Sequence, residues 1–337
     1  MLALNVTTEL WSLKEPFRIS GYSFTQAELI LVTLRSGSAV GVGEAAGVYY
    51  RNETPQSMIA QIEAARPAIE GGITREALRE ILPPGGARNA IDCALWDIEA
   101  KLTGVPAWKT AGLRIPGALP TTYTIGADTP DKMANVARSY APAPRVKMKL
   151  TGHDDGACIV AVRRARPDAW IGVDANQAFA RASLEALMPV LVDANVGLIE
   201  QPVAIGHEAE LDGFRSPIPL AADESVQGLA DISKAKGRFD AVNIKLDKCG
   251  GLTEALMMVR AVREAGMRPM VGCMVGTSLA MTAGALVGQL CDFIDMDGAM
   301  FLASDRKPSV AHRNGDIICT TQGWGAPRND DSLRVAS

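Results

Sequence analysis

The sequence lacks the features that mark secreted, membrane-spanning and nucleic-acid-binding proteins. Its N-terminus has no basic segment followed by a long apolar run, so no signal peptide is expected. No stretch of about 18 apolar residues is free of charges and turn signals, so no membrane span is expected either. Basic runs are absent, and 34 Lys and Arg against 38 Asp and Glu give a net charge of −4. This charge balance predicts no nucleic-acid partner.

Histidine and paired cysteine are equally scarce. The three His residues lie far apart and the six Cys residues include no CxxC pair, so no zinc site is expected. Scattered cysteines in a chain of this size predict reduced thiols and a cytoplasmic location. One match to the loose dinucleotide-binding pattern, GVGEAA at residues 41–46, ends a predicted strand and opens no helix. Because the pattern of a dinucleotide site should lie between a strand and a helix, this position of the match argues against an NAD-dependent oxidoreductase.

The first part of the chain has a different order of predicted strands and helices from the rest. Residues 27–45 predict two strands joined at Ser36–Ser38, and helical periodicity follows, so we predict an α+β domain over residues 1–115. After it, eight short apolar runs alternate with helical stretches. The runs are TTYTIG, RVKMKL, WIGVDAN, VGLIEQP, IPLAADES, AVNIKL, PMVGCMV and DFIDMDG. Parallel strands joined by helices close into a (β/α)₈ TIM barrel, which we predict over residues 116–305.

Charged residues stand at the ends of the second to sixth predicted strands. They are Lys149, Asp174, Glu200, Asp223 and Lys245. These strand ends form the active-site face of a barrel, and an unpaired buried charge is costly, so a functional role outweighs five solvated loop residues. The three carboxylates come from neighbouring strands and should converge on one cation. Oxygen ligands without His or Cys favour Mg²⁺, and Asn176, in phase with Asp174, is predicted to orient a ligand.

The two lysines predict the chemistry. Lys149 and Lys245 come from strands two and six, which are opposite in a ring of eight, so two amines would face a bound substrate from both sides. A free lysine has a pKa of about 10.4. A neighbouring cation disfavours its charged form, and Lys147 is predicted to be that neighbour for Lys149. This arrangement predicts proton removal alpha to a carboxylate through a metal-stabilised enediolate, and 1,1-proton transfer by two bases, which is racemisation or epimerisation.

These motifs together resemble the enolase superfamily, muconate-lactonizing subgroup. The resemblance rests on KMK, DAN, EQP, ADES, NIKLDKCGG and the upstream DCALWDIEAKLTG, and it covers nearly the whole chain. It implies that the three carboxylates bind one Mg²⁺ per active site and that the opposed lysines are the acid/base pair. It also implies that a tail, residues 306–337, packs back on residues 1–115 as a capping domain. The segment PMVGCMVG lacks the His that the mandelate racemase subgroup has there.

A second acidic pair, Asp295 and Asp297, stands on one side of strand eight and needs a cation of its own. An α-ammonium group fits, with helix N-caps as the alternative. The DMD motif is similar to the Asp-x-Asp of dipeptide epimerases, where it binds the N-terminus of a dipeptide. Family precedent implies L-Ala-D/L-Glu, a murein dipeptide epimerised at its second residue. Its acidic side chain calls for a basic partner, and Arg18 is the candidate, with a plain surface arginine as the alternative.

Other functions are compatible with the sequence. Cycloisomerisation, o-succinylbenzoate synthesis and racemisation of N-acylamino acids use the same scaffold on substrates without a free ammonium. A non-catalytic barrel that binds a dipeptide is a further alternative, although a binder needs no opposed lysines. The sequence leaves open the second residue of the dipeptide, the preferred direction and the contribution of Gly276–Ala280, where many relatives have a glutamate. It also leaves open the oligomeric state, for which a homo-oligomer is one option.

Overall fold

The structure, a computed structural model, describes residues 2–328. The chain starts with an antiparallel sheet whose strands lie in the order β1 (Ala3–Ile19), β2 (Tyr22–Ser36) and β3 (Ala39–Ala46). After the short 3₁₀ helix η1 (Tyr49–Arg51), three helices follow: α1 (Pro55–Glu70), α2 (Arg75–Ile81) and α3 (Gly86–Thr103). Apolar residues that alternate along β2, such as Ile30 and Val32, pack on these helices and form the core of this part.

Helix α3 lies unusually close to β3. A Cβ atom on Gly43 would lie 2.0 Å from the carbonyl oxygen of Ala90, so only glycine allows this approach. The opposite face of α3 contacts the barrel, where Cys93 and Trp96 join the barrel core. The helix is therefore buried on both sides and links the two parts of the molecule.

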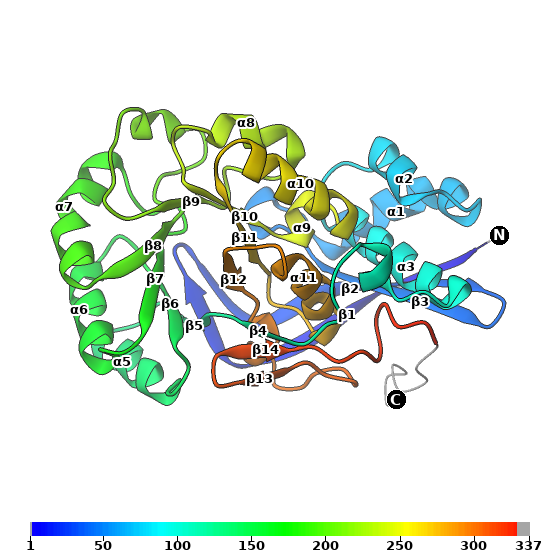
Figure 1. The fold of residues 1–337 in the computed structure, drawn as a ribbon, viewed down its shortest axis with the longest axis horizontal. Helices are drawn as coiled ribbons and strands as arrows, with labels where there is room; N and C mark the ends of the chain where they lie inside the picture. The colour runs from blue at the N-terminus through cyan, green and yellow to red at the C-terminus, as the bar shows by residue number, and fades with distance from the viewer. Residues whose placement is uncertain (1, 329–337) are drawn as a thin grey trace.

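Eight parallel strands form the second part (Figure 1). They are β5 (Tyr123–Ile125), β6 (Arg145–Lys149), β7 (Trp170–Asp174), β8 (Val196–Glu200), β9 (Leu220–Ala222), β10 (Ala241–Ile244), β11 (Arg268–Gly272) and β12 (Phe293–Asp295). Each strand pairs with its sequence neighbour, and the backbone N–H of Thr122 donates to Ile294 O at 3.0 Å, which joins the two edges. The predicted TIM barrel and the separate antiparallel sheet are confirmed.

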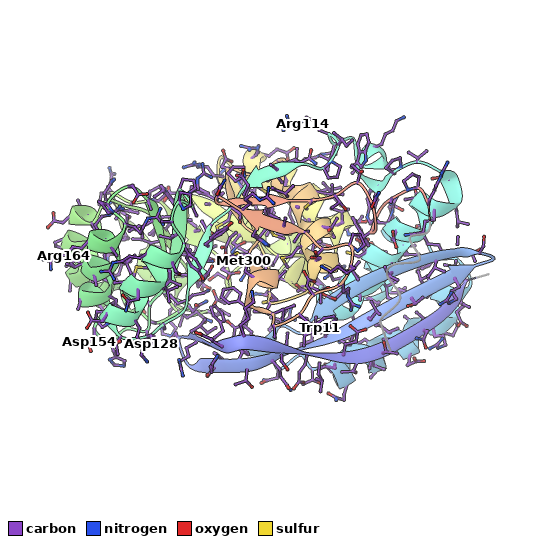
Figure 2. The ribbon with its side chains drawn as sticks, turned by 90° about the horizontal axis from the view of Figure 1, so that it is seen from below. Trp11, Arg114, Asp128, Asp154, Arg164 and Met300 are labelled. Atoms are coloured by element: carbon purple, nitrogen blue, oxygen red, sulfur yellow. The ribbon has the colours of Figure 1, made fainter. Side chains whose placement is uncertain are left out.

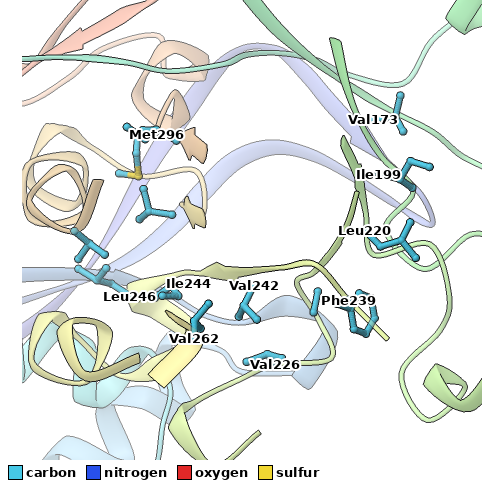
Figure 3. Packing of buried hydrophobic residues seen from close by; sticks show 14 of the residues in the cluster. Val173, Ile199, Leu220, Val226, Phe239, Val242, Ile244, Leu246, Val262 and Met296 are labelled. Carbon is cyan, nitrogen blue, oxygen red and sulfur yellow. The ribbon is translucent and has the colours of Figure 1, made fainter. Parts of the chain in front are cut away.

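Helices cover the outside of the barrel. They are α5 (Pro130–Ser139), α6 (Asp155–Ala165), α7 (Arg181–Asp193), α8 (Ile232–Ala235) after the 3₁₀ helix η3 (Leu229–Asp231), α10 (Leu252–Glu264) and α11 (Ser278–Gly288). The short helix α9 (Leu246–Cys249) instead follows the end of β10, is buried and contacts α3. Val173, Ile199 and Val242 are among the strand residues that pack beneath the outer helices (Figure 3). One crossover departs from the regular pattern, because β8 and β9 are joined only by η2 (Glu208–Leu211). Gly206 and Gly213, both with positive φ, and Pro217 interrupt helical periodicity there.

The C-terminal part contacts both halves. Its strands β13 (Ala311–Arg313) and β14 (Asp316–Ile318) form a small sheet with β4 (Ala118–Pro120), which precedes the barrel. Farther on, Trp324 Nε1 donates to Cys93 O on α3 at 3.1 Å, and Ala107 N, at the start of α4 (Ala107–Thr110), donates to Gly325 O at 2.9 Å. Residues 329–337 of the predicted tail lie outside the described residues, and the division into residues 1–115, 116–305 and 306–337 stays a prediction.

Within residues 2–328 no helix is both long enough and apolar enough to cross a membrane.

Candidate active site

The three predicted metal ligands meet at one end of the barrel. Asp174 and Glu200 are the last residues of β7 and β8, and Asp223 directly follows β9. One carboxylate oxygen from each lies within 4.8 Å of the others, and all three residues are fully buried. Adjacent parallel strands end at the same edge of the sheet, which is why side chains 22 to 26 residues apart in sequence come together.

The donor set fits Mg²⁺. It consists of carboxylate oxygens alone, without His or Cys, as a hard divalent cation prefers. Asn176 lies beside the carboxylates in the left-handed region, with φ 40°, and its backbone N–H donates to Asp174 Oδ1 at 2.9 Å. Its side-chain Oδ1 is buried without a hydrogen-bond partner among the described residues, so a polar acceptor remains available at the site.

The two predicted bases each contact a different member of this triad. Lys149 Nζ lies 2.6 Å from Asp174 Oδ2, and Lys245 Nζ lies 2.6 Å from Asp223 Oδ2. They come from β6 and from the residue after β10, four strands apart in the barrel order. Burial would lower the pKa of Lys245, but the carboxylates of Asp223 and Glu200 outweigh it and raise that pKa well above its ordinary value. The carboxylates that hold Lys245 charged are the ones that would bind the metal.

Lys147 lies deeper in the barrel and connects the two acidic groups. Its Nζ is 3.0 Å from Glu200 Oε2 and 3.6 Å from Asp174 Oδ2, and it forms an ion pair with Asp295. Burial lowers the pKa of this amine, yet Asp295 and the other carboxylates raise it well above its ordinary value. Lys147 is therefore a lasting positive charge beside Lys149, with which it shares Asp174 Oδ2.

Two further residues hold the carboxylates and were not singled out from the sequence. Lys248 is fully buried, and its Nζ lies 2.6 Å from Asp223 Oδ1 and 2.9 Å from the Asn243 carbonyl oxygen. Asn243 donates from Nδ2 to Glu200 Oε1 at 2.6 Å. Both have a sequence signal, because AVNIKLDK puts an amide inside an apolar strand and a second lysine three residues after the first.

The oxygens of these ligands have different affinities for protons. Burial first, and then the charge of Asp174, raise the pKa of Glu200 to about 7. Burial would also raise the pKa of Asp223, but the ammonium groups of Lys245 and Lys248 lower it below its ordinary range. Of Glu200 and Asp223, Glu200 is thus the ligand that more needs an additional cation to stay ionised.

The two members of the acidic pair on strand eight, Asp295 and Asp297, have different hydrogen-bond partners and different pKa shifts. Asp295 is bonded to Lys147 and to the Thr122 hydroxyl, and Lys147 lowers its pKa although burial opposes this. Asp297 accepts the Thr124 backbone N–H at 2.6 Å, and burial together with Asp295 raises its pKa to about 7. Asp297 precedes the 3₁₀ helix η4 (Gly298–Phe301), but its side chain makes no N-cap hydrogen bond. Among residues 2–328, Asp297 is therefore the member of the pair that has no cationic side chain bonded to it.

A cavity of about 330 Å³ opens over these groups, between the barrel and the N-terminal sheet. Lys147, Lys149, Lys245, Asn176, Asp295 and Asp297 all line it. Arg18 does not. Phe17 and Ile19 line the cavity, so Arg18, between them on β1, points to the other face of the strand. It is half-exposed and pairs with Asp128 at 3.5 Å (Figure 2 labels Asp128 beside the tip of the β1–β2 hairpin). The structure therefore does not bring Arg18 to the other predicted site residues.

The segment Gly276–Ala280 binds the N-terminal sheet. The backbone N–H and hydroxyl of Thr277 donate to the two Glu44 oxygens at 2.7 and 2.6 Å. Arg306, from the C-terminal part, lies 3.0 Å from Glu44 Oε2. Thr277 and Glu44 are fully buried, so this segment joins the two halves of the molecule.

Fold and site define a class: barrel proteins whose strand ends hold an acidic metal site between two opposed lysines. Two family models match the chain. One, the mandelate racemase / muconate lactonizing enzyme N-terminal domain, matches residues 1–112, and the other, described as enolase C-terminal domain-like, matches residues 132–331. The chain therefore belongs to the enolase superfamily, in the mandelate racemase / muconate lactonizing enzyme family, as the motifs predicted.

Individual relatives are consistent with this assignment. The chain is 39% identical to the L-Ala-D/L-Glu epimerase of Escherichia coli K12 over 94% of this chain and 99% of that one. It is similar to a solved enolase family member from Agrobacterium tumefaciens with homology to dipeptide epimerases, which has bound sodium and L-Ala-L-Glu (TM-score 0.93, 39% identity, 95% and 98% covered). It is also similar to the dipeptide epimerase of Enterococcus faecalis V583 complexed with Mg and L-Leu-L-Tyr (TM-score 0.88, 27% identity, 96% and 98% covered).

Proposed function

We propose that this protein is an Mg²⁺-dependent dipeptide epimerase that inverts the α-carbon of the second residue, with L-Ala-D/L-Glu as a substrate pair. The observation that carries the proposal is one cavity lined by Lys149 and Lys245, which contact opposite members of the carboxylate triad, and by Asp297. The named activities of the relatives support the same class.

Different residues of this chain would carry the separate steps of the proposed epimerisation. Asp174, Glu200 and Asp223 would hold the metal, which when bound supplies positive charge for the substrate's carboxylate as negative charge develops on it. One of the opposed lysines removes the α-proton and the other delivers a proton to the opposite face, which inverts the carbon. The reaction is symmetric, so each lysine acts as acid in one direction and as base in the other.

Asp297 sets the position of the dipeptide along the cavity. Its carboxylate lines the cavity, and no cationic side chain in the described part of the chain is bonded to it, so the α-ammonium group of a dipeptide completes its environment. Asp295 is held by its ion pair with Lys147. This role of Asp297 separates the dipeptide reaction from cycloisomerisation, o-succinylbenzoate synthesis and N-acylamino acid racemisation, whose substrates carry no ammonium.

The proposal is tested by proton NMR of L-Ala-L-Glu with the protein and Mg²⁺ in D₂O. We expect loss of the glutamate α-proton signal and growth of the L,D diastereomer. Lys149→Ala and Lys245→Ala should each abolish inversion, while Lys109→Ala, an exposed lysine on α4, should leave it unchanged. If no dipeptide in a panel of second residues showed α-proton exchange, the proposed epimerase activity would be wrong. The alternative functions, including a barrel that binds a dipeptide without catalysis, would then be favoured.

Two further predictions accompany this function. A cytoplasmic location is supported by the six cysteines, all of which are unpaired thiols. A homo-oligomer stays a prediction, which light scattering after size-exclusion chromatography would check.

A further inference from the structure

The wall of the cavity opposite the catalytic groups is aromatic. Phe17, Phe24, Tyr49 and Phe301 line it together with Ile19, Met274 and Val275. The rings form one row, in which Phe17 and Phe24 are direct partners across β1 and β2. Phe17 and Phe301 have ring centroids 4.5 Å apart, and Phe24 and Tyr49 have centroids 5.4 Å apart, with Tyr22 packed on Tyr49 at 4.5 Å.

The two ends of this row, Phe301 and Tyr49, lie toward different ends of the cavity. Phe301 belongs to η4, directly after Asp297, so the Phe17–Phe301 pair lies at the ammonium end. Tyr49 lies at the other end. It packs on Tyr50 with ring centroids 5.1 Å apart, and Gln227 Nε2 donates to the Tyr50 hydroxyl at 2.8 Å and to the carbonyl oxygen of Glu224, the residue after the metal ligand Asp223, at 2.7 Å. Burial and the charges of Glu224 and Asp223 also raise the pKa of Tyr49. The second residue of a dipeptide carries the α-carboxylate that the metal would bind, so its side chain would lie at the Phe24–Tyr49 end of the cavity.

This end of the cavity offers no free cation to an acidic side chain. Among the described residues that line the cavity, the only cationic ones are Lys147, Lys149 and Lys245, and each is ion-paired with a carboxylate. Glu28 also lines the cavity and adds negative charge. A carboxylate buried without a partner cation is costly, whereas an apolar side chain gains by leaving water.

We propose that the Phe24–Tyr49 subsite takes a large uncharged second residue, such as Phe, Tyr or Leu, and prefers it to Glu. This inference rests on the proposed function and names a further substrate class for the same site. The ring faces give apolar contact area, and their spacing suits edge-to-face contact with an aromatic side chain.

The test compares kcat/KM for L-Ala-L-Phe, L-Ala-L-Leu, L-Ala-L-Glu and L-Ala-L-Lys with the Mg²⁺-loaded protein, followed by α-proton exchange in D₂O. We expect the Phe and Leu dipeptides to exceed the Glu and Lys dipeptides by about tenfold or more, and any ratio above one supports the subsite. A ratio of one or less overturns this inference while leaving the epimerase standing. Exchange with none of the four fails the proposed function as well.

Variants locate the preference on the predicted wall. Phe24→Ala should reduce the Phe-to-Glu ratio of kcat/KM, and Phe24→Leu, which keeps an apolar wall, should restore most of it. Phe301→Ala, at the ammonium end, serves as the matched control. It should lower kcat/KM for every dipeptide and leave the ratio unchanged. If Phe301→Ala changed the ratio and Phe24→Ala did not, the placement of the second residue would be wrong.

Discussion

Glu200 shows at the residue scale how a buried ligand is fixed before any ion arrives. Asn243 Nδ2 donates to one of its oxygens and Lys147 to the other. Asn243 itself fits only because Gly272 faces it, since a Cβ there would lie 2.6 Å from Asn243 Oδ1. Residues that orient a metal ligand affect metal affinity nearly as strongly as the ligands do.

We therefore expect Asn243→Ala to weaken Mg²⁺ binding by about 10- to 100-fold. The measurement is isothermal titration of Mg²⁺ into the variant, with circular dichroism to confirm that it is folded. Asn135→Ala, on the exposed face of α5, should bind Mg²⁺ like the wild type. Unchanged affinity in Asn243→Ala would mean that Glu200 needs no support from this amide.

The pKa of Asp297 gives a pH dependence. This pKa is raised to about 7, so the carboxylate loses its charge as pH falls below that value and no longer binds an ammonium group. The α-amine of a dipeptide, with a pKa of about 7.7–8.0, loses its charge at higher pH. We expect kcat/KM, measured at saturating Mg²⁺ so that metal binding does not limit it, to rise with pH through about 7 and to fall above about 8.

Asp297→Asn removes the group that titrates on the acid side. Its kcat/KM should be lower by about 30-fold or more, the equivalent of about 2 kcal/mol for an unpaired buried charge. The rise near pH 7 should be absent in this variant, while the fall above pH 8, which belongs to the substrate, should remain. An unchanged acid limb would assign that titration to another group.

At the scale of elements, three segments meet at Glu44: β3, the turn before α11, and the start of the C-terminal part. Arg306 bonds to Glu44 and Glu9, and its guanidinium lies over the Trp11 ring at 5.0 Å. Glu44 is buried, so removing the arginine leaves a carboxylate without a partner charge. The contact holds the sheet over the mouth of the barrel, where Phe17 and Phe24 line the cavity.

We expect Arg306→Met to lower the free energy of unfolding by about 3–5 kcal/mol, measured by chemical denaturation. Lys132→Met, which removes an exposed ion pair with Asp128, should cost about 0.5 kcal/mol or less. The double variant Glu44→Gln/Arg306→Met should be more stable than the sum of the single effects predicts, because no unpaired charge remains. Strict additivity would show that the pair does not couple.

The sequence predicted the strands better than their connections. Each barrel strand is a short apolar run between turn residues, a local signal, and all eight were found. The crossover from β8 to β9 is not an α-helix because glycine and proline interrupt it. Helix α3 also buries two polar residues, Asn89 and Asp92, which are bonded to Asp247 and Thr253 of the barrel. The burial of such polar residues depends on the element that packs against them, so it produces no periodic pattern in the sequence.

At the scale of the whole molecule, the order of strands around the barrel determined which charges would converge. Asp174, Glu200 and Asp223 could be assembled from sequence because adjacent parallel strands end at one edge. The partner of each charge could not, since Lys147 on β6 pairs with Asp295 on β12, on the far side of β5. Arg18 shows the same limit, because its direction follows from which face of β1 covers the cavity.

The ion pairs within the site predict how the whole fold responds to metal. Lys149, Lys245 and Lys248 neutralise the carboxylates, so the chain should stay folded when EDTA removes Mg²⁺. Mg²⁺ binds the folded site and not the unfolded chain, so at 100 times its Kd it should add about 2.7 kcal/mol of stability, seen as a higher Tm. Asp174→Asn should abolish this shift, and the exposed Asp193→Asn should retain it, at matched ionic strength. Unfolding in EDTA would mean that the lysines do not compensate for the carboxylates, and a shift that survived in Asp174→Asn would place the ion elsewhere.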